Sequence, residues 1–310
     1  MMAYVPVLAG KREDLLETAE ARWTGVRAAR PDLAPAVALQ RSLLTLVAEL
    51  GGTIDAGRLP RLSLPPKYLA AKLARGVPVF AGEPIPLPVN VLRSTLLRLC
   101  DALAGGGAGE AATHIHDAIE SGNIEAGSLL AASLKRDQAA IRTGAVHRGL
   151  SPDLVWLVAE LAVSPFVHIL QRMVLTAAGE SALTAALAAW TRGYCPACGS
   201  WPALAEVVGG HRTLRCSFCS SAWELPTYAC IYCEEAGPPF VPAAPNEERK
   251  DRRVEVCATC GGYLKTIDLL ELSRFPLLSI SDIETTDLDV AAMEHGYVRP
   301  PLKDFGARHG

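Results

Sequence analysis

The stretch CSFCSSAWELPTYACIYC, residues 216–233, decides how the last third of the chain folds. It joins two C-x-x-C pairs and belongs to a set of four: Cys195/Cys198, Cys216/Cys219, Cys230/Cys233 and Cys257/Cys260. A C-x-x-C pair on a tight turn brings two sulfur atoms near one point, and two such turns complete a tetrahedron. Four thiolates in that geometry select zinc or iron. The sequence therefore predicts tetrahedral metal sites after residue 194.

Four pairs can be combined into two sites in three ways. The quoted stretch could be one compact site, which leaves the first pair to find the fourth. An interleaved arrangement would join the first pair to the third and the second to the fourth. Sequential pairing joins the first to the second across 17 intervening residues and the third to the fourth across 23. We favour sequential pairing, because it needs the shortest loop closures and the first spacer is typical of zinc ribbons.

The pattern of residues around these pairs predicts small β-hairpins. After Trp190, short alternating runs such as HRTLRC and RRVEVC lead into cysteine pairs. A loose duplication is visible: each copy begins with a cysteine pair, runs through a hairpin, enters a second pair and continues to an aromatic, Trp223 or Tyr263. Residues 237–253 read as an exposed, mobile loop in the second copy. Gly199 and Gly261 directly follow a pair, which lets backbone amides turn toward the sulfur atoms.

The preceding residues have the periodicity of helices. Leucines recur at spacings of three and four over residues 92–103 and 154–161, and no useful strand pattern interrupts them. The most apolar stretch, residues 154–170, contains Glu160 and Pro165, so we interpret it as a buried helix pair and not as a membrane segment. Cys100, the ninth cysteine, is predicted to be a buried structural thiol.

These patterns predict a multi-domain chain, α plus small β. An all-α multihelical domain, residues 1–190, precedes two tandem metal modules, residues 191–227 and 228–275. Residues 276–310 would form a C-terminal tail packing on the domains. A chain of 310 residues is long enough to bury more than one core.

Composition and charge exclude several functions. Half of the residues are hydrophobic and the net charge is −3, as in folded globular proteins. Residues 193–267 carry seven basic side chains against eight acidic ones with no basic stripe, which argues against nucleic-acid binding. No basic segment precedes the short apolar run at the N-terminus, so we expect no secretory signal, no membrane insertion and a cytoplasmic protein.

The sequence also gives no sign of catalysis. No hydrolase or transferase constellation is present, so we predict that the protein is not an enzyme. A C-x-x-C dithiol for redox exchange would need an α/β setting, which is missing. Asp282, Glu284, Asp287 and Asp289 read as a solvated acidic segment, because no glycine turn spaces them as in a calcium loop.

Taken in order, the motifs resemble those of the FdhE family of formate dehydrogenase accessory proteins. The matching segments are GYCPACGS (193–200), LRCSFC with Trp223 (214–223), CIYCE (230–234), CATCGGYLKT (257–266) and the L-D-x6-G-Y-x-R pattern (288–299). They cover about a third of the chain. One departure is Ser281-Asp282, where the family tends to carry paired aspartates.

The resemblance implies a multihelical domain followed by two rubredoxin-like modules, each holding iron through four cysteines, with zinc as the alternative. The resemblance implies that the metal ligands of this chain are Cys195, Cys198, Cys216, Cys219, Cys230, Cys233, Cys257 and Cys260. It further implies an accessory protein that docks on the catalytic subunit of respiratory formate dehydrogenase and assists its maturation in the cytoplasm. Two other hypotheses stay open: a rubredoxin-like electron-transfer protein, and a zinc-ribbon protein with purely structural metals.

Overall fold

The computed structural model describes residues 4–7, 10–55, 59, 62, 64–176, 181–244 and 251–302. The chain divides into two compact units that are interleaved along the sequence. The helical unit comprises Gly10–Ser63 and Gly82–Leu170, and the sheet unit comprises Met1–Ala9, Leu64–Ala81 and Gln171–Gly310. The domain boundaries predicted at residues 190, 227 and 275 stay predictions, because the units follow spatial contacts and not continuous segments.

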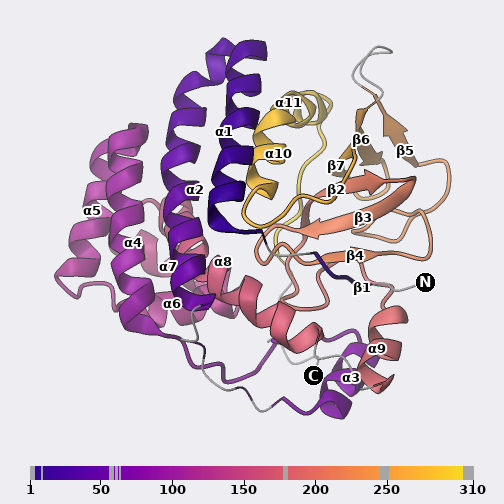
Figure 1. Ribbon diagram of the computed structural model, residues 1–310, viewed down its shortest axis with the longest axis horizontal. Coiled ribbons are helices and arrows are strands. Elements are labelled where there is room, and N and C mark those ends of the chain that lie inside the picture. Colours follow the sequence, from indigo (N-terminus) through magenta and orange to yellow (C-terminus); the bar gives the residue numbers. More distant parts are fainter. Residues whose placement is uncertain are drawn as a thin grey trace. The chain divides into compact units, whose positions relative to one another are not determined.

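The helical unit is built from amphipathic helices, as the leucine spacing predicts. Its elements are α1 (Arg12–Ala29), η1 (Pro31–Leu33), α2 (Ala34–Asp55), α4 (Val89–Leu103), η2 (Ala104–Ala108), α5 (Gly109–Glu120), α6 (Ala126–Leu134), α7 (Gln138–His147) and most of α8 (Pro152–Leu175) (Figure 1). Leu92, Leu96 and Leu99 of α4 are fully buried, and so is Cys100, which confirms its prediction as a core thiol.

Helix α8 corrects one expectation. The predicted pair of helices split at Pro165 is one continuous helix with this proline inside it. Length and composition alone would let two helices cross a membrane, Pro31–Ile54 and Pro152–Leu175. In the second, 72% of the apolar window is buried within the protein, as in a core helix, against 33% in the first.

The sheet unit contains seven strands in the order β1-β4-β3-β2-β7-β6-β5. Their bounds are β1 (Tyr4–Val5), β2 (Pro202–Val208), β3 (His211–Cys216), β4 (Ala222–Glu224), β5 (Phe240–Ala243), β6 (Arg252–Cys257) and β7 (Gly262–Leu269). Two of them were missed from sequence. Strand β1 comes from the N-terminal half, where no strand was expected, and β5 lies inside the predicted exposed loop 237–253.

The strand order makes the internal duplication explicit. Strands β2, β3 and β4 of the first copy correspond to β5, β6 and β7 of the second, and neighbours within each copy are antiparallel. The copies are joined by parallel pairing of β2 with β7, for example Ala205 opposite Thr266. The second copy therefore repeats the first by a shift along the sheet, and equivalent strand ends lie on the same side.

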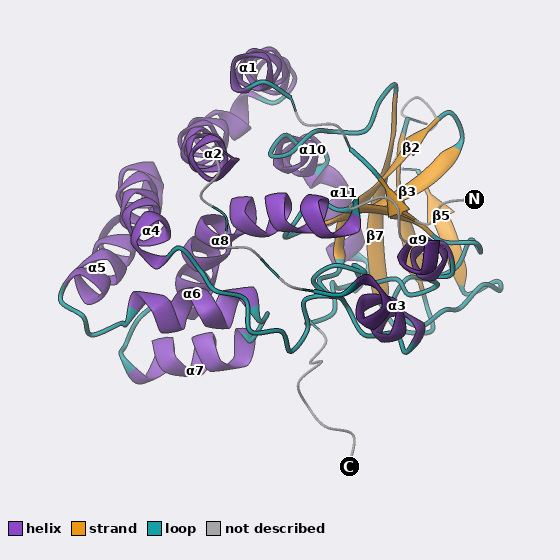
Figure 2. Ribbon diagram, turned by 60° about the horizontal axis from the view of Figure 1, so that its bottom comes forward, coloured by secondary structure: helices purple, strands orange, loops and turns teal. Residues whose placement is uncertain are grey.

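Four helices complete the described part of the sheet unit, two from the C-terminal segment and two from the interior of the chain (Figure 2). The C-terminal segment, predicted to be a tail that packs on the domains, forms α10 (Leu278–Glu284) and α11 (Thr286–Glu294). Leu278 of α10 packs on Ile267, and Ala292 of α11 packs on Tyr263, so both helices cover one face of the sheet. Helix α3 (Pro66–Ala74) pairs with α9 (Ser181–Ala188).

Candidate metal centres

All four C-x-x-C pairs adopt the same backbone turn. The amide of the residue after the second cysteine donates a hydrogen bond to the carbonyl of the first cysteine, at 2.8–3.2 Å. That residue has a positive φ in every copy: Gly199 (82°), Ser220 (54°), Glu234 (65°) and Gly261 (68°). Only glycine adopts this region without strain, which is why the two glycines were visible in the sequence. Ser220 and Glu234 occupy the same position and gave no such signal.

The turns gather the eight cysteines in the sequential arrangement. One cluster contains Cys195, Cys198, Cys216 and Cys219, and the other contains Cys230, Cys233, Cys257 and Cys260. We refer to them as the first and second centres. In each, the four sulfur atoms lie within 4.8 Å of one another. None of the nine cysteines forms a disulfide.

The sulfur spacing fits a single tetrahedral ion. Sγ–Sγ distances are 3.4 Å for Cys198–Cys216, 3.6 Å for Cys195–Cys219 and 3.7 Å for Cys198–Cys219. In the second centre the Sγ–Sγ distances of Cys230–Cys260 and Cys233–Cys257 are both 3.6 Å. A metal–sulfur bond of about 2.3 Å places tetrahedral thiolates about 3.8 Å apart. The other sulfur pairs are at most 4.8 Å apart, so each cluster can close on one ion with shifts of about an ångström or less.

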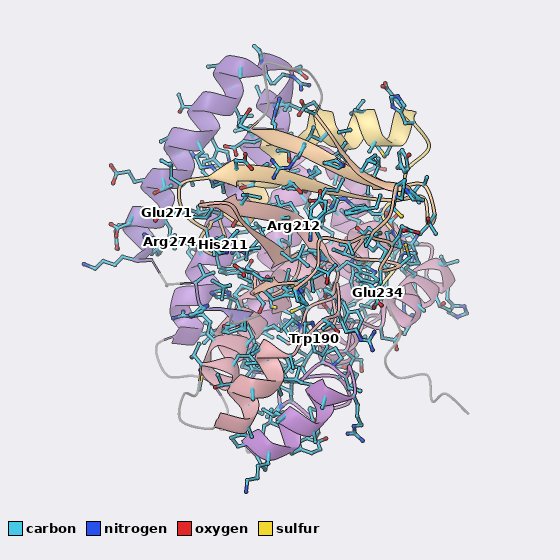
Figure 3. All side chains as sticks on the ribbon, turned by 90° about the vertical axis from the view of Figure 1, so that its right-hand side faces the viewer. Trp190, His211, Arg212, Glu234, Glu271 and Arg274 are labelled. Carbon is cyan, nitrogen blue, oxygen red and sulfur yellow. The ribbon has the colours of Figure 1, made fainter. Side chains whose placement is uncertain are left out.

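Both centres lie at the same end of the sheet. Strands β3 and β6 end at Cys216 and Cys257, while the parallel strands β2 and β7 begin beside them. In Figure 3, Glu234, which follows Cys233, lies at the opposite end of the strands from His211, where β3 begins. The shift that relates the two copies thus sets the two centres side by side at the same end of the strands.

The first centre is enclosed. All four of its cysteines are buried. The amides of Val79 and Phe80 donate hydrogen bonds to the carbonyls of Pro196 and Ala197, inside the first turn, at 2.9 and 3.0 Å. The buried Lys72 ammonium holds this covering segment by donating to the carbonyls of Val79 and Ala81 at 3.0 and 2.6 Å. No pattern in the sequence marked residues 79 and 80 as the cover of a metal site.

The second centre is open. Cys230 and Cys257 are buried and pack with Phe240 and Tyr232, whereas Cys233 and Cys260 are exposed. Tyr232 stands edge-on to Trp201, with ring centroids 4.9 Å apart. Among the described residues, the C-terminal strand-like segment comes close, because the amide of Val298 donates to the carbonyl of Gly261 at 2.9 Å.

The environments change the acidity of the thiols. Burial raises the pKa of Cys195 and of Cys219 well above the usual thiol value. Burial also raises the pKa of Cys257, but hydrogen bonds from the backbone of Cys260, from the thiol of Cys233 and from the backbone of Thr259 outweigh it and leave that pKa lowered. Because metal ligands must be thiolates, an ion entering the first centre displaces protons from buried thiols.

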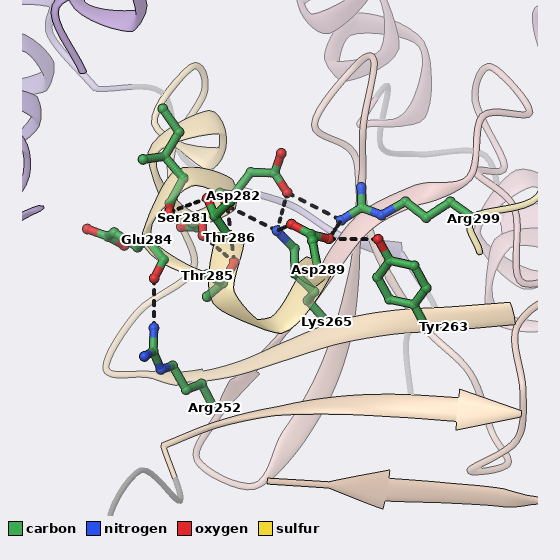
Figure 4. Close-up of polar contacts among 11 residues, drawn as sticks. Arg252, Tyr263, Lys265, Ser281, Asp282, Glu284, Thr285, Thr286, Asp289 and Arg299 are labelled. Atoms are coloured by element: carbon green, nitrogen blue, oxygen red, sulfur yellow. Dashed lines mark hydrogen bonds and ion pairs between the residues drawn. The ribbon is translucent and has the colours of Figure 1, made fainter. Parts of the chain in front are cut away.

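The sequence predicted that the acidic segment near the C-terminus is solvated, but two of its carboxylates bind a buried lysine. Lys265 of β7, with no exposed side-chain surface, places its Nζ 2.6 Å from Asp282 Oδ1 and 2.7 Å from Asp289 Oδ2 (Figure 4). Arg299 lies 2.9 Å from Asp289 and 3.4 Å from Asp282, and the Tyr263 hydroxyl donates to Asp289 at 2.9 Å. We call these five residues the lysine cluster. It joins residues of the CATCGGYLKT motif to residues of the L-D-x6-G-Y-x-R motif.

Basic side chains near the centres are also neutralised internally. Arg215 and Glu206 form an ion pair in which neither side chain is exposed, and Arg212 donates to Glu255 at 2.8 Å. Residues 245–250, with two of the counted basic side chains, lie outside the described residues. Pairing of this kind leaves these two arginines little free positive charge for phosphate groups.

The chain is similar to several proteins named FdhE. No family model matches the chain. It is 29% identical over 115 residues to an FdhE homolog of Aquifex aeolicus, covering 36% of this chain and 40% of the relative. It is 34% identical over 119 residues to an FdhE homolog of Pseudomonas aeruginosa, covering 35% and 38%, and 30% identical over 118 residues to FdhE of Escherichia coli O127:H6, covering 37% and 38%.

The chain thus matches about two fifths of the length of these curated relatives. A solved structure extends the likeness to the fold of the whole chain. The crystal structure of the FdhE protein from Pseudomonas aeruginosa superimposes with a TM-score of 0.57, covering 98% of this chain and 99% of that one at 22% identity. With curated FdhE relatives in sequence and the FdhE fold over nearly its full length, the chain's resemblance to the FdhE family is confirmed.

Proposed function

We propose that this protein is an accessory factor for the cytoplasmic maturation of respiratory formate dehydrogenase. It would dock on the catalytic subunit of that enzyme and have no turnover of its own. The observation that carries the proposal is the pair of tetrahedral four-cysteine centres in a chain with FdhE relatives and the FdhE fold. The absence of a catalytic constellation in the sequence supports a factor that acts by binding.

In this proposal the eight cysteines are metal ligands, four to each centre, and the ion is iron. Iron held by four thiolates can exchange single electrons, whereas zinc in the same site is redox-inert. Backbone amides near the sulfur atoms, such as Ala197 N at 3.4 Å from Cys195 Sγ and Phe218 N at 3.4 Å from Cys216 Sγ, would lower the charge on the thiolates. The same contacts suit zinc, so the metal needs a measurement.

Docking is tested by recovering the partner from cells. The full chain, tagged and expressed without oxygen in cells that make respiratory formate dehydrogenase, should retain the catalytic subunit, identified by mass spectrometry. Cells that lack the subunit and cells that express the tag alone serve as controls. Repeated anoxic purifications without the subunit, from cells that contain it, would refute docking.

The metal assignment is tested by elemental analysis and optical spectroscopy on anoxically purified protein. Two irons per chain and a sulfur-to-iron charge-transfer spectrum that bleaches on reduction would support the iron proposal. Two zinc ions without colour, in protein from an iron-sufficient host, would contradict iron and leave the centres as scaffold. One ion per chain would contradict two four-cysteine centres.

A second candidate, a rubredoxin-like electron-transfer protein, is favoured by the exposure of Cys233 and Cys260. An electron carrier needs one edge of its centre near the surface. It also needs iron that is reduced and reoxidised at a potential accessible to its partner. Zinc in both centres would exclude this candidate while leaving the accessory role intact.

A further inference from the structure

We propose that the two centres have different roles: the first is a permanent structural site, and the second is an exchange site that gives up its ion to a thiolate-bearing or chelating acceptor. The inference rests on the proposed role of the cysteines as metal ligands. It assigns a distinct function to the second centre on the basis of burial and of the segments that surround each centre.

The first centre is closed by chain segments from three places. Residues 79 and 80 pair with the first turn, and Lys72 holds that segment through two carbonyl groups. The N-terminal strand β1 lies on β4, and the Tyr4 hydroxyl donates to Gln171 Oε1 at 3.0 Å. Gln171 Oε1 also accepts a hydrogen bond from Ser221 Oγ, just past the second turn, at 3.3 Å. An incoming ligand reaches these sulfur atoms only after this region opens.

Among the described residues, the amide of Val298 contacts the turn of the second centre at the Gly261 carbonyl, but Cys233 and Cys260 stay exposed beside it. Where the first copy has β1 beside its last strand, β7 instead pairs with β2 of the other copy. The outer edge of the second copy is β5, a four-residue strand in which Val241, Pro242 and Ala243 are exposed. One cysteine of each turn, Cys233 and Cys260, is exposed. These two thiolates are therefore open to attack without any unfolding.

The exposed pair also has a suitable geometry for stepwise exchange. Cys233 and Cys260 come from different turns, and each faces a buried cysteine of the opposite turn at 3.6 Å. An acceptor thiolate would form one bond to the ion as the bond to Cys233 or Cys260 breaks, and the released thiolate takes a proton from water. The buried Cys230 and Cys257 would leave last. The ion keeps its oxidation state throughout, so no oxidant or reductant is needed.

The acceptor is expected to bind the ion through soft donor atoms. A four-thiolate site holds a soft or borderline ion, so a competing group must offer sulfur or nitrogen donors. The exposed side chains of β5 are apolar, and the exposed charge next to Cys233 is the carboxylate of Glu234. Carboxylate or phosphate ligands would find neither the right donor class nor attracting charge there.

Kinetics of metal loss test the inference. The full chain is loaded with zinc, its content is confirmed as two ions, and release to the chromophoric chelator 4-(2-pyridylazo)resorcinol is followed by absorbance. We expect two phases of one equivalent each, with the slow phase at least about tenfold slower because it needs local opening. In parallel, brief iodoacetamide treatment and peptide mass spectrometry should find Cys233 and Cys260 alkylated first.

Matched variants assign the phases. Cys233→Ser should accelerate or abolish the fast phase and leave the slow phase unchanged. Lys72→Met, which releases the cover of the first centre without touching a ligand, should accelerate only the slow phase. Release of both ions in one phase, or first alkylation at the first centre, would overturn the inference while the metal content still supports the proposed function. Failure to bind two ions would overturn both.

Discussion

Replacing Lys265 with methionine should destabilise the C-terminal helices, because it removes the buried centre of the lysine cluster. The Lys265 side chain has no exposed surface, and its ammonium contacts two carboxylates, at 2.6 Å and 2.7 Å. Methionine has nearly the same length and fills the same space, so the change removes charge and hydrogen bonds and leaves no large cavity. The expected loss is therefore electrostatic.

The loss of stability in Lys265→Met depends on the contacts that the two aspartates keep. Removing one partner of a buried ion pair costs about 3–5 kcal/mol. Arg299 stays within 3.4 Å of both aspartates, and the Asp282 side chain is 45% exposed against 20% for Asp289. Both facts reduce the loss of stability, so we expect the lower end of this range, about 3 kcal/mol. This corresponds to about 150-fold faster amide exchange where the helices open locally.

Hydrogen exchange followed by mass spectrometry measures the local loss of stability in peptides from β7, α10 and α11 of the metal-loaded chain. Arg253→Met is the matched control, since it removes one charge from the neighbouring strand β6. Its pair with Asp268 has side chains 26% and 46% exposed and should contribute at most about 1 kcal/mol. Adding Asp289→Asn to Lys265→Met should restore part of the protection, because it removes an uncompensated carboxylate. Exchange in Lys265→Met that matches Arg253→Met would refute the reasoning.

Three further predictions concern the sheet unit. Burial raises the pKa of Asp282, but the charges of Lys265 and Arg299 outweigh burial and hold this pKa below its ordinary value. The Asp282 carboxylate therefore stabilises the fold fully above about pH 3.9, and this stabilisation is lost as the pH falls through the lower pKa of the folded state. Protection of α10 should then fall in acid, and less so in Lys265→Met. Ser220→Gly should raise the thermal midpoint by relieving a φ of 54°, a gain of about 1 kcal/mol, and a lower midpoint would contradict this. Gly193→Ala would place a Cβ 2.0 Å from the Ile231 carbonyl oxygen and should destabilise the chain by about 3 kcal/mol in urea unfolding; an unchanged urea midpoint would contradict the close approach.

The cysteine spacing was sufficient to predict the grouping of the eight thiols, because each C-x-x-C turn and each hairpin is a local structure. Cys195 and Cys216 are joined by one hairpin, β2–β3, so their approach needs no information from the rest of the chain. The leucine spacing predicted α4 for the same reason, since helical contacts join residues three and four apart. The duplication was visible because it repeats the same local units.

What the sequence did not reveal depends on contacts between distant segments. Nothing in Tyr4–Val5 indicates that it pairs with β4 more than 200 residues later, and nothing in residues 78–81 marks them as the cover of a metal centre. The residues of the lysine cluster come from β7, α10, α11 and the segment beyond, and their charges look solvated until the fold buries Lys265.

The sequence was therefore sufficient to predict how the eight cysteines group, and the tertiary structure decided how the two centres differ. Their cysteine patterns are nearly the same, so by themselves they predict two equivalent sites. The shift that relates the copies places β1 beside one copy and leaves the other at an open edge, β5. Burial is a property of what packs around a site, and the segments that bury the first centre lie far from it in the chain.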